Sequence, residues 1–180
     1  TRMRPLSICW GGGTAPIVIE GRVPAPGVFP PTRGTKFVSP GYFEAMGATY
    51  AGGRAFTAFD TIDAPPVVIV NETFARRYLP AGAVGTVLRN WASGIGPLGL
   101  NLMARQAGQH DGFPTEIVGV VADVKNAPLG QDVEPAIYFP ARQFPFSEVF
   151  LAVRATDLTA AQAAVRGALR SVAPTVPIGL

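Results

Sequence analysis

The sequence has a single cysteine and a single histidine among its 180 residues. One cysteine cannot form an internal disulfide, and it supports neither a cysteine-rich zinc site nor an iron–sulfur cluster. One histidine excludes any metal motif that needs a pair of histidines. These two absences exclude most classes of metalloenzyme, and we expect the protein to carry no cofactor.

Charged side chains are also scarce, at 15% of the chain, and the formal net charge is only +3. So small a positive surplus gives no argument for nucleic acid binding, and we expect no nucleic acid partner. Hydrophobic residues make up 48% of the chain, a share that excludes a disordered protein. The composition therefore predicts a folded domain with a sizeable core.

Long hydrophobic runs are missing as well. The densest stretches, residues 67–70 and 149–153, have the length of strands and fall far short of the ~18–20 apolar residues that a membrane helix needs. The chain starts at Thr1 without an initiator methionine and stops at Leu180 without a polar tail. We therefore expect it to be an excised soluble piece of a longer protein, although a processed or engineered start would look the same.

Glycine and proline, in contrast, are abundant, with 21 and 18 residues. They predict short elements joined by many turns. Strand-like segments alternate with helix-like segments, and several strands are adjacent along the chain. This order predicts an α+β fold with mixed sheets. Strands are expected over residues 17–22, 36–38, 67–70, 84–89, 116–124, 135–140 and 148–154, and residues 1–16 are expected to form a loop.

The helices are marked by their capping residues. Ser39 as a cap, Pro40 at the first position and Gly47 as a stop predict a helix of about two turns. Asn71 is a good cap for a second helix, which Pro80 ends. A third helix follows Thr156 or Asp157, and its apolar residues recur at helical spacing on one stripe. That stripe contains Leu158, Ala161, Val165, Ala168, Leu169 and Val172.

Catalytic groups are hard to find. His110 beside Asp111 could act as a base and Cys9 as a nucleophile, but no G-x-S-x-G turn is present. An exposed loop histidine and a small buried cysteine are the ordinary interpretations of these residues. An enzyme that uses Cys9 or His110 is therefore the least favoured hypothesis.

Two further patterns resemble binding motifs only superficially. Asp60, Asp63 and Asp123 could hold a hard cation, but acids this far apart in loops are better explained as solvated turn residues. Residues 94–99 imitate a dinucleotide-binding fingerprint, yet Pro97 interrupts them and no strong strand precedes them. We expect no catalytic, metal or cofactor site.

The connection over residues 90–114 is long for a compact domain, and loops of this length are usually functional or disordered. Its apolar side chains predict either a surface for partner contact or a collapsed local flap. The residues in question are Trp91, Ile95, Leu98, Leu100, Leu102 and Met103.

Three ordered blocks carry a resemblance to a known family. They are residues 37–47 (FVSPGYFEAMG) followed by 53–56 (GRAF), residues 65–80 (PPVVIVNETFARRYLP), and residues 116–124 (EIVGVVADV) followed by 134–140 (EPAIYFP). In this order the sequence resembles the MacB-like periplasmic core domain of ABC-transporter permeases of the MacB/FtsX type. The resemblance is closest to the multi-copy permeases of acidobacteria.

This resemblance implies a domain outside the cytoplasmic membrane, between the first two transmembrane helices of a membrane-embedded parent. It implies two lobes of α+β structure with mixed sheets. Residues 1–64 and 143–180 would form a porter-like lobe, and residues 65–142 would form a small inserted Sabre-like lobe.

The resemblance also implies a noncatalytic function. ATP would be hydrolysed by a cytoplasmic ATPase domain or subunit, and the periplasmic lobes would transmit the motion to a periplasmic partner or substrate. A second permease copy and a periplasmic adaptor are the implied partners. The alternative is a stand-alone extracytoplasmic domain that binds a hydrophobic peptide or lipid with residues 91–103 as its mouth.

Overall fold

The computed structural model describes residues 7–10, 14–22, 32–90, 113–124, 132–143, 150–153 and 155–175. Among these residues, no helix combines the length and the apolar character needed to cross a membrane. The elements in chain order are β1 (Ser7–Trp10), β2 (Thr14–Ile19), β3 (Thr32–Val38), α1 (Tyr42–Met46), β4 (Tyr50–Gly53), β5 (Val67–Asn71), α2 (Glu72–Tyr78), β6 (Val87–Asn90), β7 (Phe113–Val121), β8 (Ala136–Pro140), β9 (Phe150–Ala152) and α4 (Leu158–Val172).

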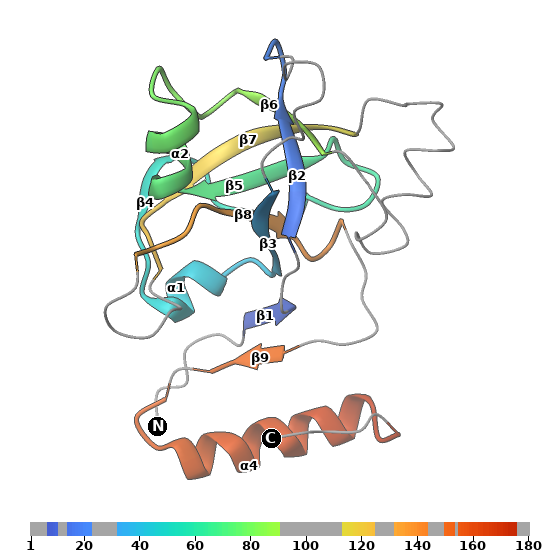
Figure 1. Cartoon of the computed structure of the whole chain (residues 1–180). Coiled ribbons are helices and arrows are strands. Elements are labelled where there is room, and N and C mark those ends of the chain that lie inside the picture. Colours follow the sequence, from blue (N-terminus) through green and yellow to red (C-terminus); the bar gives the residue numbers. More distant parts are fainter. Residues whose placement is uncertain are drawn as a thin grey trace.

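Six strands form a closed ring in the order β2, β6, β7, β5, β8, β3 and back to β2. The strand that closes it is β2 (Figure 1). Its first half pairs with β3, with Thr14 opposite Gly34. Its second half pairs with β6, with Ile17 opposite Asn90. One short strand therefore bonds to two different neighbours and leaves the ring without an open side.

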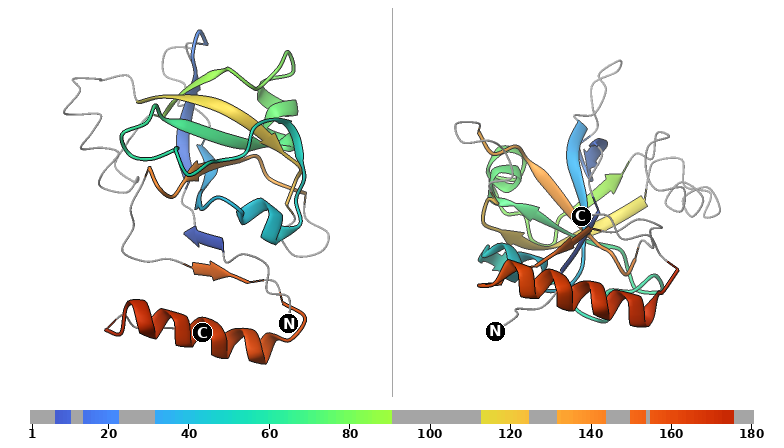
Figure 2. Two further views of the ribbon diagram at one scale, coloured as in Figure 1. Left: turned by 180° about the vertical axis from the view of Figure 1, so that it is seen from behind. Right: turned by 90° about the horizontal axis from the view of Figure 1, so that it is seen from below.

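The sheet is mixed. The pairs β3–β8 and β5–β7 are parallel, whereas β2–β3, β2–β6, β6–β7 and β5–β8 are antiparallel. The predicted α+β class with mixed sheets is therefore confirmed. Three strands extend the sheet beyond the ring: β1 pairs with β3, β9 pairs with β1, and β4 pairs with β7. In Figures 1 and 2, β9 lies between β1 and α4 at one end of the molecule.

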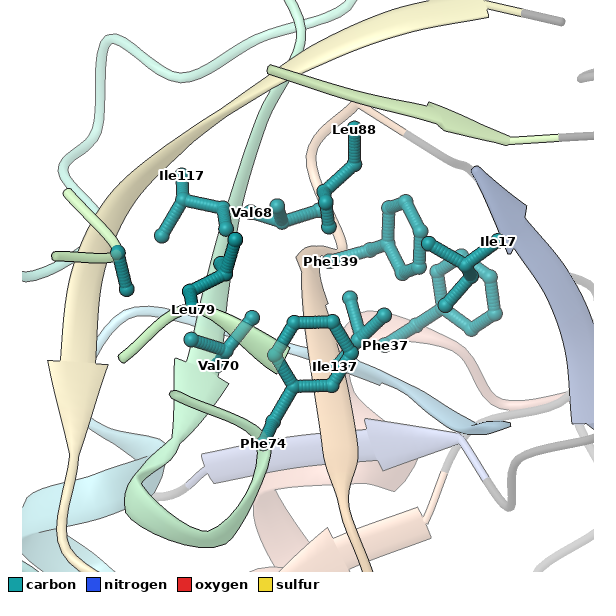
Figure 3. Close-up of a cluster of buried hydrophobic side chains, with 11 residues drawn as sticks. Ile17, Phe37, Val68, Val70, Phe74, Leu79, Leu88, Ile117, Ile137 and Phe139 are labelled. Carbon is teal, nitrogen blue, oxygen red and sulfur yellow. The ribbon is translucent and has the colours of Figure 1, made fainter. Parts of the chain in front are cut away.

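The first hydrophobic core lies on the inner face of the ring (Figure 3). All six ring strands contribute to it, and α2 closes it with Phe74. Phe37 and Phe139 stack across the parallel pair β3–β8 with ring centroids 5.2 Å apart. Burial of each such side chain stabilises the fold by roughly 1.5–3 kcal/mol. The buried members are Ile17, Phe37, Val68, Val70, Phe74, Leu79, Ala83, Leu88, Ile117, Ile137 and Phe139.

The second core lies on the opposite face of β5, β7 and β8, where α1 covers it. Phe43 of α1 meets Tyr138 of β8 edge to face, with ring centroids 4.8 Å apart. Val67 and Ile69 point into this core, whereas Val68 and Val70 point into the first. This arrangement confirms the prediction, made from its lack of polar alternation, that the strand at 67–70 is covered on both faces.

A close approach between β4 and β7 depends on two glycines. Gly53 has φ of 71°, and a β-carbon there would collide with the carbonyl of Val118. A β-carbon at Gly119 would collide with the carbonyl of Arg54. The prediction that Gly119 permits a close backbone approach is confirmed, although β4 itself was not expected.

Several expected boundaries are wrong. Residues 7–10 and 14–16 form strands and not a loop, because their partners in β3 and β9 are distant in the sequence. Helix α1 begins at Tyr42, since Gly41 takes the cap position with φ of 88° and no side chain caps the helix. The expected Ser39 cap is therefore incorrect. Gly47 ends α1 with φ of 72°, as predicted.

The C-terminal helix is confirmed at Leu158–Val172, and Asp157 caps it by accepting a hydrogen bond from Ala160 N at 3.0 Å. Its apolar stripe, however, is poorly covered. Ala161 is buried, whereas Leu158 and Val172 are 66% and 85% exposed. The middle of the stripe is better covered than its ends, since Val165 and Leu169 are half-buried.

Candidate functional site

The residues proposed for partner contact, namely Trp91, Ile95, Leu98, Leu100, Leu102 and Met103, lie outside the described residues, as do His110 and Asp111. Cys9 lies in β1, where its backbone is opposite Val38 of β3 and Phe150 of β9. Whether Cys9 and His110 share a site is therefore not tested by the described residues.

Asp60 is the centre of an ordered loop between β4 and β5. Arg54 donates to both oxygens of this carboxylate, from Nη1 at 2.9 Å and from Nη2 at 2.8 Å. Thr57 adds a bond from its backbone N–H at 2.7 Å and another from its hydroxyl at 3.1 Å. Burial of Asp60 would raise its pKa, but the bonds from Arg54 and Thr57 outweigh burial and hold the pKa below its ordinary value.

Asp123 has a comparable role after β7. It accepts from the backbone N–H of Thr73 at 3.0 Å, from the Thr73 hydroxyl at 2.7 Å and from Arg76 Nη2 at 3.2 Å. Burial would raise the pKa of Asp123, but these hydrogen bonds lower it. The carboxylate thus fixes the first turn of α2 to the end of β7.

The three acids considered for a cation site lie in different surroundings. Asp63 is exposed, whereas Asp60 is buried and bound to Arg54, and Asp123 is bound to Thr73 and Arg76. Within the described ranges no group of three metal-ligating side chains is arranged to hold an ion. The expectation of solvated turn residues is wrong for Asp60 and Asp123, because both are partners in structural ion pairs.

Asn71 joins three elements. Its side-chain oxygen accepts from Phe74 N at 3.0 Å and so caps α2, as predicted. The same oxygen accepts from Ala136 N at 2.9 Å, and the amide nitrogen donates to the Glu134 carbonyl at 3.0 Å. One buried side chain therefore joins the end of β5, the start of α2 and the start of β8.

Gln143 is a second buried amide, which sequence reasoning missed. Its oxygen accepts from Val67 N at 3.2 Å, and its nitrogen donates to the Pro65 carbonyl at 2.9 Å. The turn after β8 thereby fixes the start of β5. Nothing in the local sequence marks this role, because the partners are more than seventy residues away.

The same ordered loop, residues 54–66, displays apolar side chains to solvent. Phe59 is 86% exposed and Ile62 is 46% exposed. The Phe59 N–H donates to the Thr57 hydroxyl at 3.2 Å, so the backbone that carries the ring is held. A held backbone with exposed apolar tips is suited to contact with another surface, and it supplies no group for acid–base chemistry.

The polar side chains described above fix strands, helices and loops to one another. The chemistry that they support is positioning, with carboxylates and amides used as structural acceptors and donors. A sequence signal existed for Asn71 in the capping pattern, but none existed for the Arg54–Asp60 pair or for Gln143.

Comparison with known proteins gives a match to one family model, that of the MacB-like periplasmic core domain, over residues 14–171. No curated protein gives a significant match. Among solved structures, the chain is similar to the periplasmic region of MacB from Actinobacillus actinomycetemcomitans, with a TM-score of 0.61 and 13% identity. That match covers 94% of this chain and 67% of the MacB region.

The chain is also similar to the extracellular domain of YknZ, a noncanonic ABC-type transporter from Gram-positive bacteria. The TM-score is 0.56 at 12% identity, and the match covers 89% of this chain and 70% of that domain. At such low identities the two solved structures establish a shared fold.

Proposed function

We propose a mechanical role for this chain, which belongs to the MacB-like periplasmic core domain family. The family resemblance inferred from the sequence is thereby confirmed, and the chain is a periplasmic core domain of an ABC-transporter permease. In our proposal it is a noncatalytic coupling body. It transmits the ATP-driven movement of membrane helices to a partner or substrate in the periplasm.

The observation that carries this proposal is the closed strand ring. Each of its six strands is hydrogen-bonded to two neighbours, and close-packed side chains fill its inner face. Close-packed interiors have low compressibility and pass strain on to their surroundings. A body of this kind moves as a unit when one end is displaced, which is what force transmission requires.

The polar network supports the same function. The ion pairs of Asp60 and Asp123 hold the loops next to β4 and β7 in place. The hydrogen bond of Gln143 holds the start of β5. These contacts stiffen the connections, which are usually the softest parts of a domain. We infer that the loops follow the ring when it moves.

The division into two lobes, residues 1–64 with 143–180 and residues 65–142, stays a proposal. Strands β3 and β8 pair over five residues across the predicted boundary, from Gly34 opposite Ala136 to Val38 opposite Pro140. Two lobes divided at that boundary would share a continuous sheet. A shared sheet favours joint movement of the lobes over a hinge between them.

The partners are proposals as well. We propose a cytoplasmic ATPase domain or subunit as the energy source, a second permease copy as the structural counterpart and a periplasmic adaptor as the recipient of the motion. The six apolar side chains of residues 91–103 stay predicted contact residues. Phe59 and Ile62 add a second contact surface, because their loop is held in place while both side chains are exposed.

Spin-label distances in the full-length permease test this function. Cysteines replace Asp63 and Ala81, which are exposed and lie in different loops, in a cysteine-free background. We expect ATP to change the distance between Ala81 labels on two permease copies. The distance between labels at positions 63 and 81 within one copy should stay the same with ATP and with ADP. A changed distance within one copy, or no change between copies, would contradict rigid-body coupling.

A further inference from the structure

The first and the last strand that the structure describes pair with each other. β1 and β9 run antiparallel, with Ser7 opposite Ala152 and Cys9 opposite Phe150. Figures 1 and 2 show this pair at one end of the molecule, between the ring and α4. Main-chain hydrogen bonds therefore join two segments that are far apart in the sequence. β1 and β9 together are termed the terminal strand pair.

The register of the terminal strand pair places its two outer ends side by side. Ser7 begins β1 and Ala152 ends β9, and these two residues are opposite each other. The chain therefore enters β1 and leaves β9 at the same end of the pair. At the other end β1 is attached to the ring, because Cys9 lies opposite Val38 of β3. The pair thus links the segments that flank it to the ring.

Helix α1 supports the terminal strand pair. It contacts both β1 and β9. The helix is itself held in the second core, where Phe43 packs edge to face on Tyr138 of β8. A two-stranded ribbon alone is marginally stable in water. Its pairing with β3 and its contact with α1 therefore make the terminal strand pair part of the same packed body as the ring.

The strand order makes β9 dependent on β1. Among the described strands, β9 pairs with β1 and with no other. Separation of β1 and β9 would break the hydrogen bonds between β9 and the sheet, and the freed N–H and C=O groups would need other partners. Movement that arrives through α4 and β9 therefore reaches the ring through the sheet only while the terminal strand pair is closed.

We infer that the terminal strand pair stays closed throughout the ATP cycle and makes the two flanking segments move the ring together. This inference rests on the proposed function, in which ATP-driven movement of membrane helices reaches the domain. Displacement of both segments in one direction leaves the pairing intact and passes through β1 to β3. Displacement in opposite directions would separate Ser7 from Ala152 first, since both lie at the end of the pair away from the ring.

Disulfide crosslinking in the full-length permease tests this inference. In a cysteine-free background that includes Cys9→Ser, cysteines replace Ser7 and Ala152, or Ile8 and Leu151, which are the next opposite pair. Opposite residues of an antiparallel pair have Cα atoms about 4.5–5.5 Å apart, within the range of about 4.4–6.8 Å that disulfides span. Cysteines at positions 8 and 152 are the control, because neighbouring residues of a strand point to opposite faces.

The disulfide yield reports whether the strands stay paired. We expect each opposite pair to form at least tenfold more disulfide than the control pair, and to the same extent with ATP and with ADP. The second opposite pair gives an independent result where the first double variant does not fold. Equal yields in the opposite and control pairs, or a yield that falls more than twofold in one nucleotide state, would overturn the inference.

Movement of the crosslinked permease gives a second readout. A ketone-bearing amino acid at the exposed position 81 carries the spin label, so that labelling leaves the disulfide intact. We expect ATP to change the distance between the labels of two copies equally in the 7–152 crosslinked permease and in the control variant. Loss of this change in the crosslinked permease alone would overturn the inference. Absence of the change in both proteins would instead contradict the proposed function.

Discussion

At the scale of single residues, the structure is most sensitive where backbones meet without room for a side chain. At Gly119, a β-carbon would meet the Arg54 carbonyl and would lie 3.3 Å from Cγ1 of Ile69. Gly52 lies on the neighbouring strand β4, but a β-carbon there would have no atom within 4 Å. The two glycines therefore form a matched pair.

We predict that Gly119→Ala lowers the free energy of unfolding by about 1–3 kcal/mol, because the backbones of Arg54 and Gly119 must separate. Gly52→Ala should change the free energy by less than about 0.5 kcal/mol. Urea unfolding of the periplasmic domain measures both values. Equal losses of stability in the two variants would show that the close approach of β4 and β7 does not limit the size of the side chain at position 119.

The Arg54–Asp60 pair gives a prediction for pH. The pKa of Asp60 is lowered in the folded protein, so its ionised form is favoured by folding. The stabilisation is therefore complete above the unfolded pKa of about 3.9 and is lost as pH falls through the lower folded value. The pKa of Asp123 is also lowered in the folded protein, so its contribution to stability depends on pH in the same direction. The midpoint of thermal unfolding should thus fall on acidification below about pH 4.

Asp60→Asn should remove part of that acid dependence and should lower stability at pH 7 by about 1–3 kcal/mol, because Arg54 loses its charged partner. Asp63→Asn is the control, since Asp63 is exposed in the same loop. Its melting curves from pH 7 to pH 3 should follow those of the unsubstituted domain. Identical pH profiles for all three proteins would mean that the ion pair does not stabilise the fold.

At the scale of elements, the success of prediction depended on how local each signal is. Helix α2 and the strand β5 were placed well, since Asn71, Pro80 and the buried run at 67–70 are adjacent in sequence. Helix α1 was expected to begin too early, because the Ser39 and Pro40 pattern competes with Gly41, whose positive φ sets the cap. Strand β1 had no local signal, because its partners are Val38 and Phe150.

Helix α4 offers a prediction about intrinsic propensity. A β-carbon at Gly167 would meet no atom within 4 Å. Gly167→Ala should therefore stabilise the helix by about 0.8–1.0 kcal/mol, which corresponds to roughly fivefold slower amide exchange over residues 158–172. Ala163→Gly, at another exposed position of the helix, should speed exchange by a similar factor. Unchanged rates in both variants would show that propensity does not limit the stability of α4.

At the scale of the whole molecule, the sequence predicted the fold class but not the closed ring. Alternating strand and helix patterns were enough for α+β with mixed sheets. Closure depends on β2, which changes partner between Pro16 and Ile17, and no residue pattern marks that change. The family resemblance rested on three sequence blocks and holds over residues 14–171.

The predicted contact residues within 91–103 lie outside the described residues, so their role stays a prediction. The structural contacts that sequence reasoning missed lie in the loop at 54–66 and around Gln143. The reason is physical. A buried acceptor such as Asp60 is recognised by its partners in space, whereas exposed apolar residues in a long loop are recognised from composition alone. Ion pairs between distant segments therefore escape prediction from one sequence.

The pairing of β2 also has a consequence for the order in which the protein matures. A chain that reaches the periplasm from its N-terminus delivers β2 and β3 first, but β2 needs Leu88 and Arg89, and β3 needs the residues around Tyr138. The backbone N–H and C=O groups of these early strands therefore stay without their strand partners until most of the domain has been exported. Native-like order then arises late and cooperatively, and the newly exported chain passes through a stage in which it is vulnerable to aggregation.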